Sequence, residues 1–271
     1  MHCTRRLRLA AAFGLVLACL AACGGSQLAA AEPLAAGKIQ QAVEKARDFL
    51  VRQQKGDGWW EAMHSADKRV GATGLVLLAL ANAGLDDTAP AVRRGLAWLR
   101  TQVPNDTYAV SLQTMALAML APEADAAILA RNVAWLEEGQ VRAGPGAGSW
   151  SYKQTPGGGI GDNSNTQFAL LALHEAARAG IAVREETWVR SQQYWASCAN
   201  ADRSWGYSGR SPGTGSMTCA GIASLVIASN RVRQGDATAN SDRILCCQRN
   251  DVDKSAPVER GLQWLGNNFQ V

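Results

Sequence analysis

The chain has 271 residues, of which 47% are hydrophobic and 18% are charged. This much apolar surface can bury a sizeable core, which excludes a chain that is disordered throughout. The formal net charge is +4, and Arg5, Arg6 and Arg8 supply three of those charges. The small remaining charge, without a basic stripe interleaved with aromatic residues, argues against nucleic acid as a partner. The unusual count is nine Trp against four Phe and four Tyr.

Residues 1–22 have the pattern of a signal peptide of the lipoprotein type. Basic residues precede an apolar run that is too short and too early for a membrane-spanning helix. Residues 20–23 resemble a bacterial lipobox, in which Cys23 becomes the lipidated first residue, and residues 23–34 then form a flexible tether. Ordinary cleavage after residues 29–31 is the alternative. Both predict an exported protein, held to the periplasmic side of a bacterial membrane by the lipid at Cys23, or free in the periplasm or secreted.

Amphipathic segments that end in an aromatic–Leu pair come first in each repeat of the chain. In residues 39–50, Ile39, Val43, Ala46 and Leu50 recur at helical spacing among charged residues, which predicts a helix with one face in water. Further segments of this kind cover residues 92–99, 128–136 and 258–265, with a looser copy at residues 188–195.

A second kind of segment is apolar nearly all round and is predicted to form buried helices. Its four copies cover residues 72–80, 112–120, 165–173 and 217–225. Gly84 and Gly180 follow two of them, as helix-ending glycines do. The alternating β-branched runs that are typical of strands do not occur, so the sequence predicts an all-α fold.

Glycine-rich loops that carry Trp lie between the two kinds of helix. They cover residues 56–60, 148–152 and 203–207, while residues 105–108 take this place in the second repeat without a Trp. Aligned positions of the apolar helices lie 40, 53 and 52 residues apart, at Thr73, Gln113, Thr166 and Thr218. Such regular recurrence favours Trp as a packing element between repeats over Trp as a sugar-binding platform.

The repeats resemble those of the squalene–hopene cyclase and protein prenyltransferase β-subunit superfamily. Residues 53–59 are similar to the Gln-x-x-x-Gly-x-Trp loop of that family, and residues 215–225 are similar to its inner helices. The resemblance covers residues 35–271 and implies an (α/α) toroid, with the apolar helices inside and the amphipathic helices outside. The resemblance implies about six helix pairs for a closed toroid of this kind, so we expect an incomplete one of about four and a half pairs.

The last repeat is interrupted after its amphipathic segment. Residues 230–257 are polar and are predicted to form a loop, and the chain stops soon after Leu265. An open arc, association with another chain and a truncated reading frame would each explain this. We expect truncation, because the repeat stops in the middle of a unit.

The catalytic motifs that the resemblance implies are incomplete. The cyclases protonate their substrate with the middle Asp of Asp-x-Asp-Asp-Thr-Ala, and residues 85–89 match only its last four positions. Because Asp87 and Thr88 precede Pro90 and an amphipathic segment, they are predicted to cap that helix. The prenyltransferases hold zinc with Asp, Cys and His, but Asp162 has no Cys nearby. We therefore expect no metal and no cofactor; whether the chain is an enzyme stays open, with a non-enzyme favoured.

Polar and aromatic residues gather where the apolar helices begin, which is the working end of many α/α barrels. Paired carboxylates there would indicate an enzyme that acts on polysaccharides. Tyr stacks on sugars, and Asp and Asn bind hydroxyl groups. The candidate ligand-binding residues are Glu61, His64, Asp106, Tyr108, Tyr152, Asp162, Asn163, Asn165 and Tyr207.

Residues 162–166 form the strongest of these candidates. One short polar residue would be enough to cap the following helix, and this run leaves several groups to spare beside a glycine-rich loop. The sequence therefore predicts that replacing Asn163 and Asn165 with Ala abolishes ligand binding and spares thermal stability. Loss of folding would favour capping instead.

Four cysteines follow the signal, at Cys198, Cys219, Cys246 and Cys247. In an oxidising compartment they form one or two disulfides or remain as buried free thiols.

The sequence thus predicts an exported toroid module that binds an isoprenoid, a glycan or a protein partner without the family's known catalytic motifs. The alternative is an enzyme of the same superfamily that acts on an isoprenoid, as cyclases do, or on a polysaccharide as a lyase or hydrolase. A cluster of carboxylates or a metal site at the starts of the apolar helices would indicate the enzyme.

Overall fold

The computed structural model describes residues 36–62, 68–154, 159–209, 211–232, 238–240, 243–245 and 256–269. The predicted signal, the tether and Cys23 lie outside them. Residues 36–42 belong to one unit, and the described residues from Val43 onward form a second unit that holds the core. The described part of the chain has nine helices, so the all-α prediction is confirmed. One small antiparallel hairpin, β1 (Thr238–Asn240) and β2 (Arg243–Leu245), was not predicted.

Every predicted helical segment lies within one helix. The amphipathic helices are α2 (Ala36–Gln53), α4 (Pro90–Arg100), α6 (Ala126–Gly139), α8 (Glu185–Ser197) and α10 (Ala256–Asn268). The apolar helices are α3 (Arg69–Asn82), α5 (Thr107–Leu120), α7 (Asn163–Arg178) and α9 (Gly215–Val232). Gly84 and Gly180 end α3 and α7 with φ angles of +89° and +86°, as predicted. None of these described helices is both long enough and apolar enough to cross a membrane.

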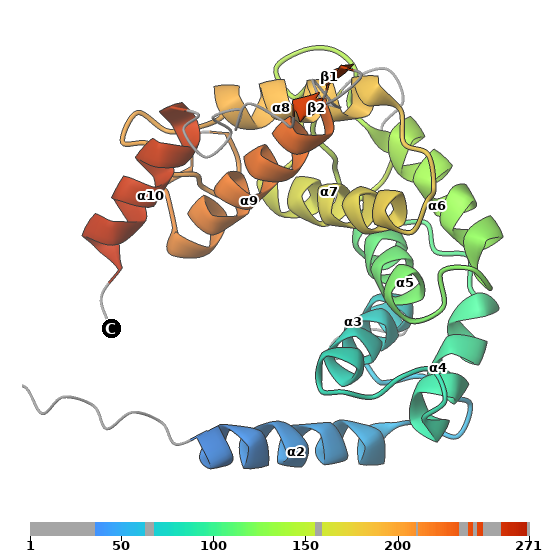
Figure 1. The fold of residues 1–271 in the computed structure, drawn as a ribbon. Helices are drawn as coiled ribbons and strands as arrows, with labels where there is room; N and C mark the ends of the chain where they lie inside the picture. The colour runs from blue at the N-terminus through green and yellow to red at the C-terminus, as the bar shows by residue number, and fades with distance from the viewer. Residues whose placement is uncertain are drawn as a thin grey trace, which may run out of the picture. The chain divides into compact units, whose positions relative to one another are not determined.

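The apolar helices pack against one another in chain order. α3 contacts α5, α5 contacts α7, and α7 contacts α9 (Figure 1). The amphipathic helices lie against them, α4 on α3, α6 on α5 and α7, and both α8 and α10 on α9. α5 has an apolar helix on either side, and ten of its fourteen residues are buried.

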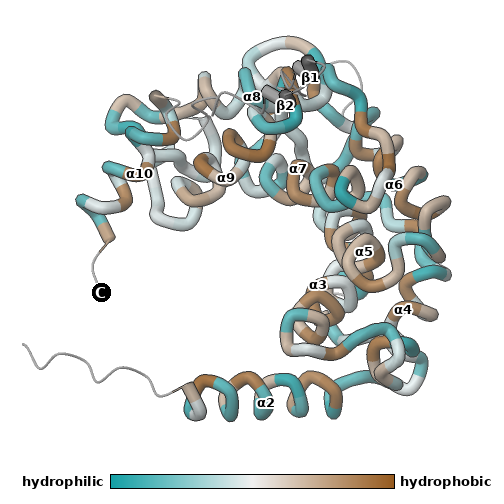
Figure 2. Tube along the Cα trace, viewed as in Figure 1, coloured by the Kyte–Doolittle hydropathy of each residue, from teal (hydrophilic) through white to brown (hydrophobic). Residues whose placement is uncertain are grey.

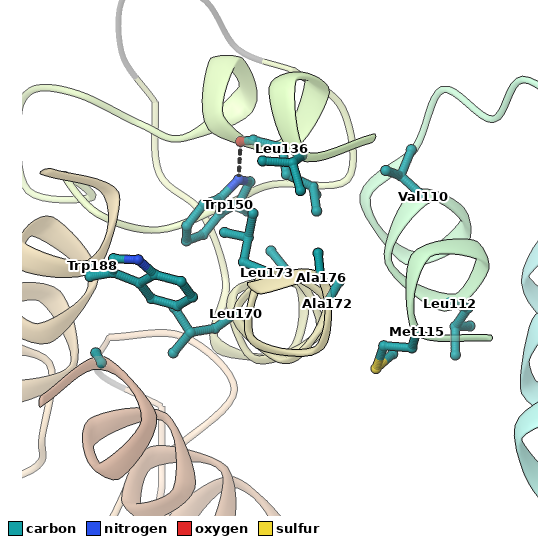
Figure 3. Packing of buried hydrophobic residues seen from close by; sticks show 13 residues of the cluster. Val110, Leu112, Met115, Leu136, Trp150, Leu170, Ala172, Leu173, Ala176 and Trp188 are labelled. Carbon is teal, nitrogen blue, oxygen red and sulfur yellow. Dashed lines mark hydrogen bonds between the residues drawn. The ribbon is translucent and has the colours of Figure 1, made fainter. Parts of the chain in front are cut away.

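Exposure departs from the prediction at the amino-terminal end. Among the apolar helices α3 packs mainly against α5, and its Leu75 is 56% exposed. None of the residues of α2 is buried, although polar and apolar residues alternate along it as the sequence predicts (Figure 2). Among the described residues, the largest cluster of buried side chains lies over α5, α6, α7 and α8 and is the one drawn in Figure 3. A second cluster lies over α3, α4, α5 and α6.

Trp150 joins the amphipathic helix before its loop to the apolar helix after it. Its indole Nε1–H donates to the carbonyl of Leu136 at 2.6 Å (Figure 3), and its backbone N–H donates to Thr166 Oγ1 at 3.0 Å. Leu136 lies in the last turn of α6, where the carbonyls have no partner within the helix. The Trp side chain is fully buried and satisfies one of these carbonyls.

Two further loops repeat this arrangement, which we call the tryptophan clamp. The indole N–H groups of Trp60 and Trp205 donate to last-turn carbonyls of α2 and α8, at Leu50 (2.7 Å) and Trp195 (3.0 Å). Their backbone N–H groups donate to the aligned threonines of α3 and α9, Thr73 (3.1 Å) and Thr218 (3.2 Å). The prediction that loop Trp residues are packing elements is confirmed for these three.

The clamp corrects the alignment of the first loop by one residue. The residue two positions before each clamp Trp has a positive φ, +99° at Gly58, +96° at Gly148 and +77° at Arg203. A Cβ on Gly58 or Gly148 would also lie 2.4 or 2.1 Å from a carbonyl oxygen of α4 or α8. Gln54 Nε2 donates to the Gly58 carbonyl at 2.9 Å. The spacing Gln-x-x-x-Gly-x-Trp is thus that of Gln54, Gly58 and Trp60, not of residues 53–59.

Gln113 replaces the clamp in the second repeat, which has no loop Trp. Its Nε2 donates to the Leu99 carbonyl in the last turn of α4 at 2.8 Å, and its Oε1 accepts from Asn132 at 2.9 Å. The predicted alignment of Gln113 with the threonines is therefore wrong. Counted from the residue that caps each helix, Val110 takes the threonine position and Gln113 lies about one turn later.

The tryptophan clamp predicts the effect of Trp150→Phe. This change keeps an aromatic ring but leaves the buried Leu136 carbonyl without its donor. We expect the free energy of unfolding to fall by about 2 kcal/mol, measured by urea denaturation with circular dichroism. Trp59→Phe is the matched control, because Trp59 is partly exposed and makes no clamp. It should change the same quantity by less than about 1 kcal/mol, and equal losses in the two variants would contradict the clamp.

Candidate functional site

Asp106 and Asp162 begin the helices at the predicted site. The Asp106 carboxylate accepts the backbone N–H of Ala109 at 3.0 Å, and that of Asp162 accepts the backbone N–H of Asn165 at 2.8 Å. Both aspartates are therefore N-caps, which confirms the capping alternative for the first residue of 162–166. Asp106 is buried, while Asp162 keeps part of its surface exposed.

Each tyrosine loop folds back onto the start of the preceding apolar helix. The backbone N–H of Thr107, first in α5, donates to the carbonyl of Tyr152 at 3.0 Å. The backbone N–H of Asn163, first in α7, donates to that of Tyr207 at 2.9 Å. These N–H groups have no partner within their own helices, so the loops satisfy them. The same contacts hold both tyrosines where the apolar helices begin.

Tyr108, Tyr152 and Tyr207 form one aromatic surface, which we call the tyrosine face. The hydroxyl groups of Tyr152 and Tyr207 lie 2.8 Å apart, and their side chains are 48% and 45% exposed. The Tyr108 ring centroid lies 5.7 Å from that of Tyr152, and its hydroxyl donates to Ser164 Oγ at 2.6 Å. The hydrogen bond between Tyr152 and Tyr207, followed by burial, raises the pKa of Tyr207. Burial raises the pKa of Tyr108, so both hydroxyl groups stay protonated at neutral pH.

Asn163 lies behind the tyrosine face and is fully buried. Its Nδ2 donates to the Gly206 carbonyl at 2.8 Å, and its Oδ1 accepts the hydroxyl of Tyr194 at 2.8 Å. Cys198 Sγ lies 3.7 Å from the same Oδ1, and burial raises the pKa of this thiol to about 12. Asn163 therefore braces the Tyr207 loop from inside and is shielded from a ligand.

Asn165 is also fully buried. Its Nδ2 donates to the Asp162 carboxylate at 2.8 Å, the same carboxylate that accepts its backbone N–H. The side chain thus fixes the orientation of the N-cap. Of the four polar side chains that begin residues 162–166, Asp162 and Ser164 are the partly exposed ones.

The remaining candidates lie apart from the tyrosine face or outside the described residues. Glu61 is exposed and pairs with Arg69 Nε at 3.7 Å and Lys55 Nζ at 3.9 Å. His64, Cys246 and Cys247 fall outside the described residues. Within them, Cys198 and Cys219 are free thiols, the first buried and the second exposed.

The partial cyclase motif occupies an exposed turn before α4. The predicted cap by Asp87 and Thr88 is wrong in detail, because the N-cap of α4 is Ala89, which makes no side-chain cap. Asp86 Oδ1 instead accepts the backbone N–H of Thr88 at 3.0 Å. Hydrogen bonds from Thr88 lower the pKa of Asp86, so this carboxylate is ionised at neutral pH. An ionised carboxylate cannot donate the proton with which a cyclase begins its reaction.

No group of three or more His, Cys, Asp or Glu side chains among the described residues could hold a metal ion. The two carboxylates where α5 and α7 begin are both engaged as N-caps. The arrangement there offers aromatic rings and hydroxyl groups to a ligand, and it presents them on elements held by backbone hydrogen bonds.

Sequence reasoning included Ser164 in the candidate run but missed Phe168 and the way both residues support the tyrosine face. Ser164 accepts the hydroxyl of Tyr108, and the Phe168 ring lies edge-on to that of Tyr108 at 4.9 Å. These two residues are four apart on α7, so helical spacing places them on one side of the helix. The four-residue spacing could have grouped Ser164 with Phe168 in the sequence. That Tyr108 of α5 packs against both is shown only by the structure.

No protein-family model matches the chain, and no curated protein is significantly similar to it.

The burial of Asn163 predicts a loss of stability for Asn163→Ala, in place of the stability-sparing loss of binding that the sequence suggests. The change leaves the Gly206 carbonyl and the Tyr194 hydroxyl without a buried partner. We expect the free energy of unfolding to fall by about 2 kcal/mol in urea denaturation. Asn82→Ala, at an exposed amide near the end of α3, should cost less than about 0.5 kcal/mol. Unchanged stability of Asn163→Ala would refute the bracing role.

Proposed function

We propose that the protein is an exported, lipid-anchored module that binds a glycan on its tyrosine face without transforming it. The observation that carries this proposal is the arrangement of Tyr108, Tyr152 and Tyr207 where the apolar helices begin. Two half-exposed rings with paired hydroxyl groups combine a surface for stacking with hydrogen-bonding groups. This combination suits a sugar ring, which has apolar C–H faces and a rim of hydroxyl groups.

An isoprenoid is less well served by this surface. A hydrocarbon chain requires a concave, mostly apolar site, whereas the tyrosine face has Ser164, Asp162 and Lys153 around its rings. An enzyme acting on polysaccharides would use two carboxylates as acid and base or nucleophile. Asp106 and Asp162 instead accept backbone N–H groups, and Asp106 is buried. These contacts favour binding over catalysis.

We further infer that the helix pairs belong to an (α/α) toroid of the squalene–hopene cyclase and prenyltransferase type. The corrected Gln54–Gly58–Trp60 spacing and the packing of α3, α5, α7 and α9 in chain order support this. The lipobox-like residues 20–23 support attachment through Cys23 on the periplasmic side of a bacterial membrane. The tyrosine face would then meet the glycans of the cell envelope.

The test is binding of cellohexaose and chitohexaose to the detergent-solubilised full chain, measured by isothermal titration calorimetry. We expect the double variant Tyr152→Ala/Tyr207→Ala to lower the affinity for a bound oligosaccharide by roughly tenfold or more. Phe49→Ala is the matched control, since it removes an exposed aromatic ring from α2, and it should leave the affinity unchanged.

Two results would overturn the proposal. One is binding of farnesol, but of no oligosaccharide, to the wild-type chain. The other is oligosaccharide binding that the tyrosine variants do not weaken. Release of shortened sugars on long incubation would favour the enzyme, and the same samples report it by chromatography.

A further inference from the structure

A pocket of about 300 Å³ lies between the start of α3 and the loop that leads from α4 into α5. The residues that give it chemical character are Arg69, Trp98, Gln102, Asn105 and Asp106. It combines a cation, an aromatic ring and two amides with one carboxylate, which is engaged as the N-cap of α5. Such a concave site with a few polar groups is typical of small-ligand subsites.

Arg69 is held in place by aromatic packing. Its guanidinium carbon lies 4.1 Å from the centroid of the Trp59 ring, and the Trp59 and Trp98 ring centroids lie 6.4 Å apart. Its ion pair with Glu61 is 3.7 Å long at Nε, beyond a normal hydrogen bond. Within the described residues, Nε is buried and has no acceptor. The guanidinium is thus oriented while its hydrogen-bonding capacity is incompletely used.

The pocket and the tyrosine face share a border. Lys153 Nζ donates to the carbonyl of Asn105 at 3.1 Å and to its Oδ1 at 2.7 Å. Asn105 lines the pocket, and Lys153 directly follows Tyr152 of the tyrosine face. The two sites are therefore adjacent, with cations at Arg69 and Lys153, so one extended ligand can reach both.

We propose that this pocket is the subsite for a carboxylate-bearing sugar, so that the ligand is an acidic polysaccharide. This rests on the proposed glycan binding and adds its chemical class. Arg69 pairs with the carboxylate through charge-assisted hydrogen bonds, which are stronger than those between neutral groups. Trp98 packs on the sugar ring, and Gln102 and Asn105 face its hydroxyl groups. The neighbouring sugar units continue onto Tyr152 and Tyr207.

The experiment compares hexagalacturonate with its carboxyl-reduced, neutral counterpart on the detergent-solubilised full chain, by isothermal titration calorimetry at low salt. We expect tighter binding of the acidic sugar, with an affinity that falls as salt rises. Arg69→Gln should weaken its binding roughly tenfold and leave the neutral sugar within about twofold. Arg69→Lys should retain part of the preference, because it keeps the charge without the planar donor set.

Two further variants keep the test decisive. Arg142→Gln removes the same charge from an exposed loop position and should change neither affinity. Lys153→Gln removes the second cation without touching the Trp59–Arg69 stack, and it should also weaken the acidic sugar selectively. If Arg69→Gln does not fold, the affinities of Lys153→Gln for the acidic and the neutral sugar test the proposal in its place.

The outcomes separate this subsite from the proposed function. Equal affinity for the two sugars, with binding that depends on Tyr152 and Tyr207 and ignores Arg69, overturns the subsite and leaves glycan binding intact. Binding of neither sugar, nor of the neutral oligosaccharides, overturns both.

Discussion

The structure depends on a hydrogen bond from a loop indole to the last turn of an amphipathic helix. A helix leaves its final carbonyls without partners, and burying them unpaired would cost free energy. The Trp of each clamp fills this place and uses its backbone N–H to hold a threonine of the next apolar helix. One residue thus fixes both helices of a pair and the loop between them. Where the Trp is missing, Gln113 reaches the equivalent carbonyl from the apolar helix itself.

The tyrosine face follows from the clamp. Tyr152 and Tyr207 come two residues after the buried Trp150 and Trp205, so the clamp fixes where each tyrosine leaves the core. The first backbone N–H of the preceding apolar helix then donates a hydrogen bond to the tyrosine carbonyl. The groups that complete helix ends are therefore the groups that place the candidate site. Asn163 does both, because its backbone N–H donates to the Tyr207 carbonyl and its buried side chain donates to the Gly206 carbonyl. For the proposed binding of a glycan, a face already held by these hydrogen bonds would need less ordering, which lowers the entropic cost of binding.

Much of the fold could be predicted from the sequence, because the spacing of apolar residues alone separates the amphipathic helices from the buried ones. The register of the first loop was predicted one residue off. Adjacent Gln and Trp residues allow two registers, but only Gln54, Gly58 and Trp60 match all three positions, because residue 57 is Asp. That Tyr108, Tyr152 and Tyr207 gather where the apolar helices begin was predicted from the sequence. That Asn163 is buried could not be predicted, because its cover is the loop of the next repeat. The stack of Arg69 on Trp59 likewise joins residues that no spacing relates.

The clamp tryptophans hold the fold, and we propose that a separate surface binds the ligand. Indole N–H signals in ¹H–¹⁵N spectra of the full chain, assigned by Trp→Phe variants, test it directly during titration with hexagalacturonate. We predict that the signal of Trp98 in the pocket shifts, while those of Trp60, Trp150 and Trp205 stay in place and exchange slowly with deuterium. Shifts confined to the clamp indoles, or their rapid exchange in the free protein, would contradict the account.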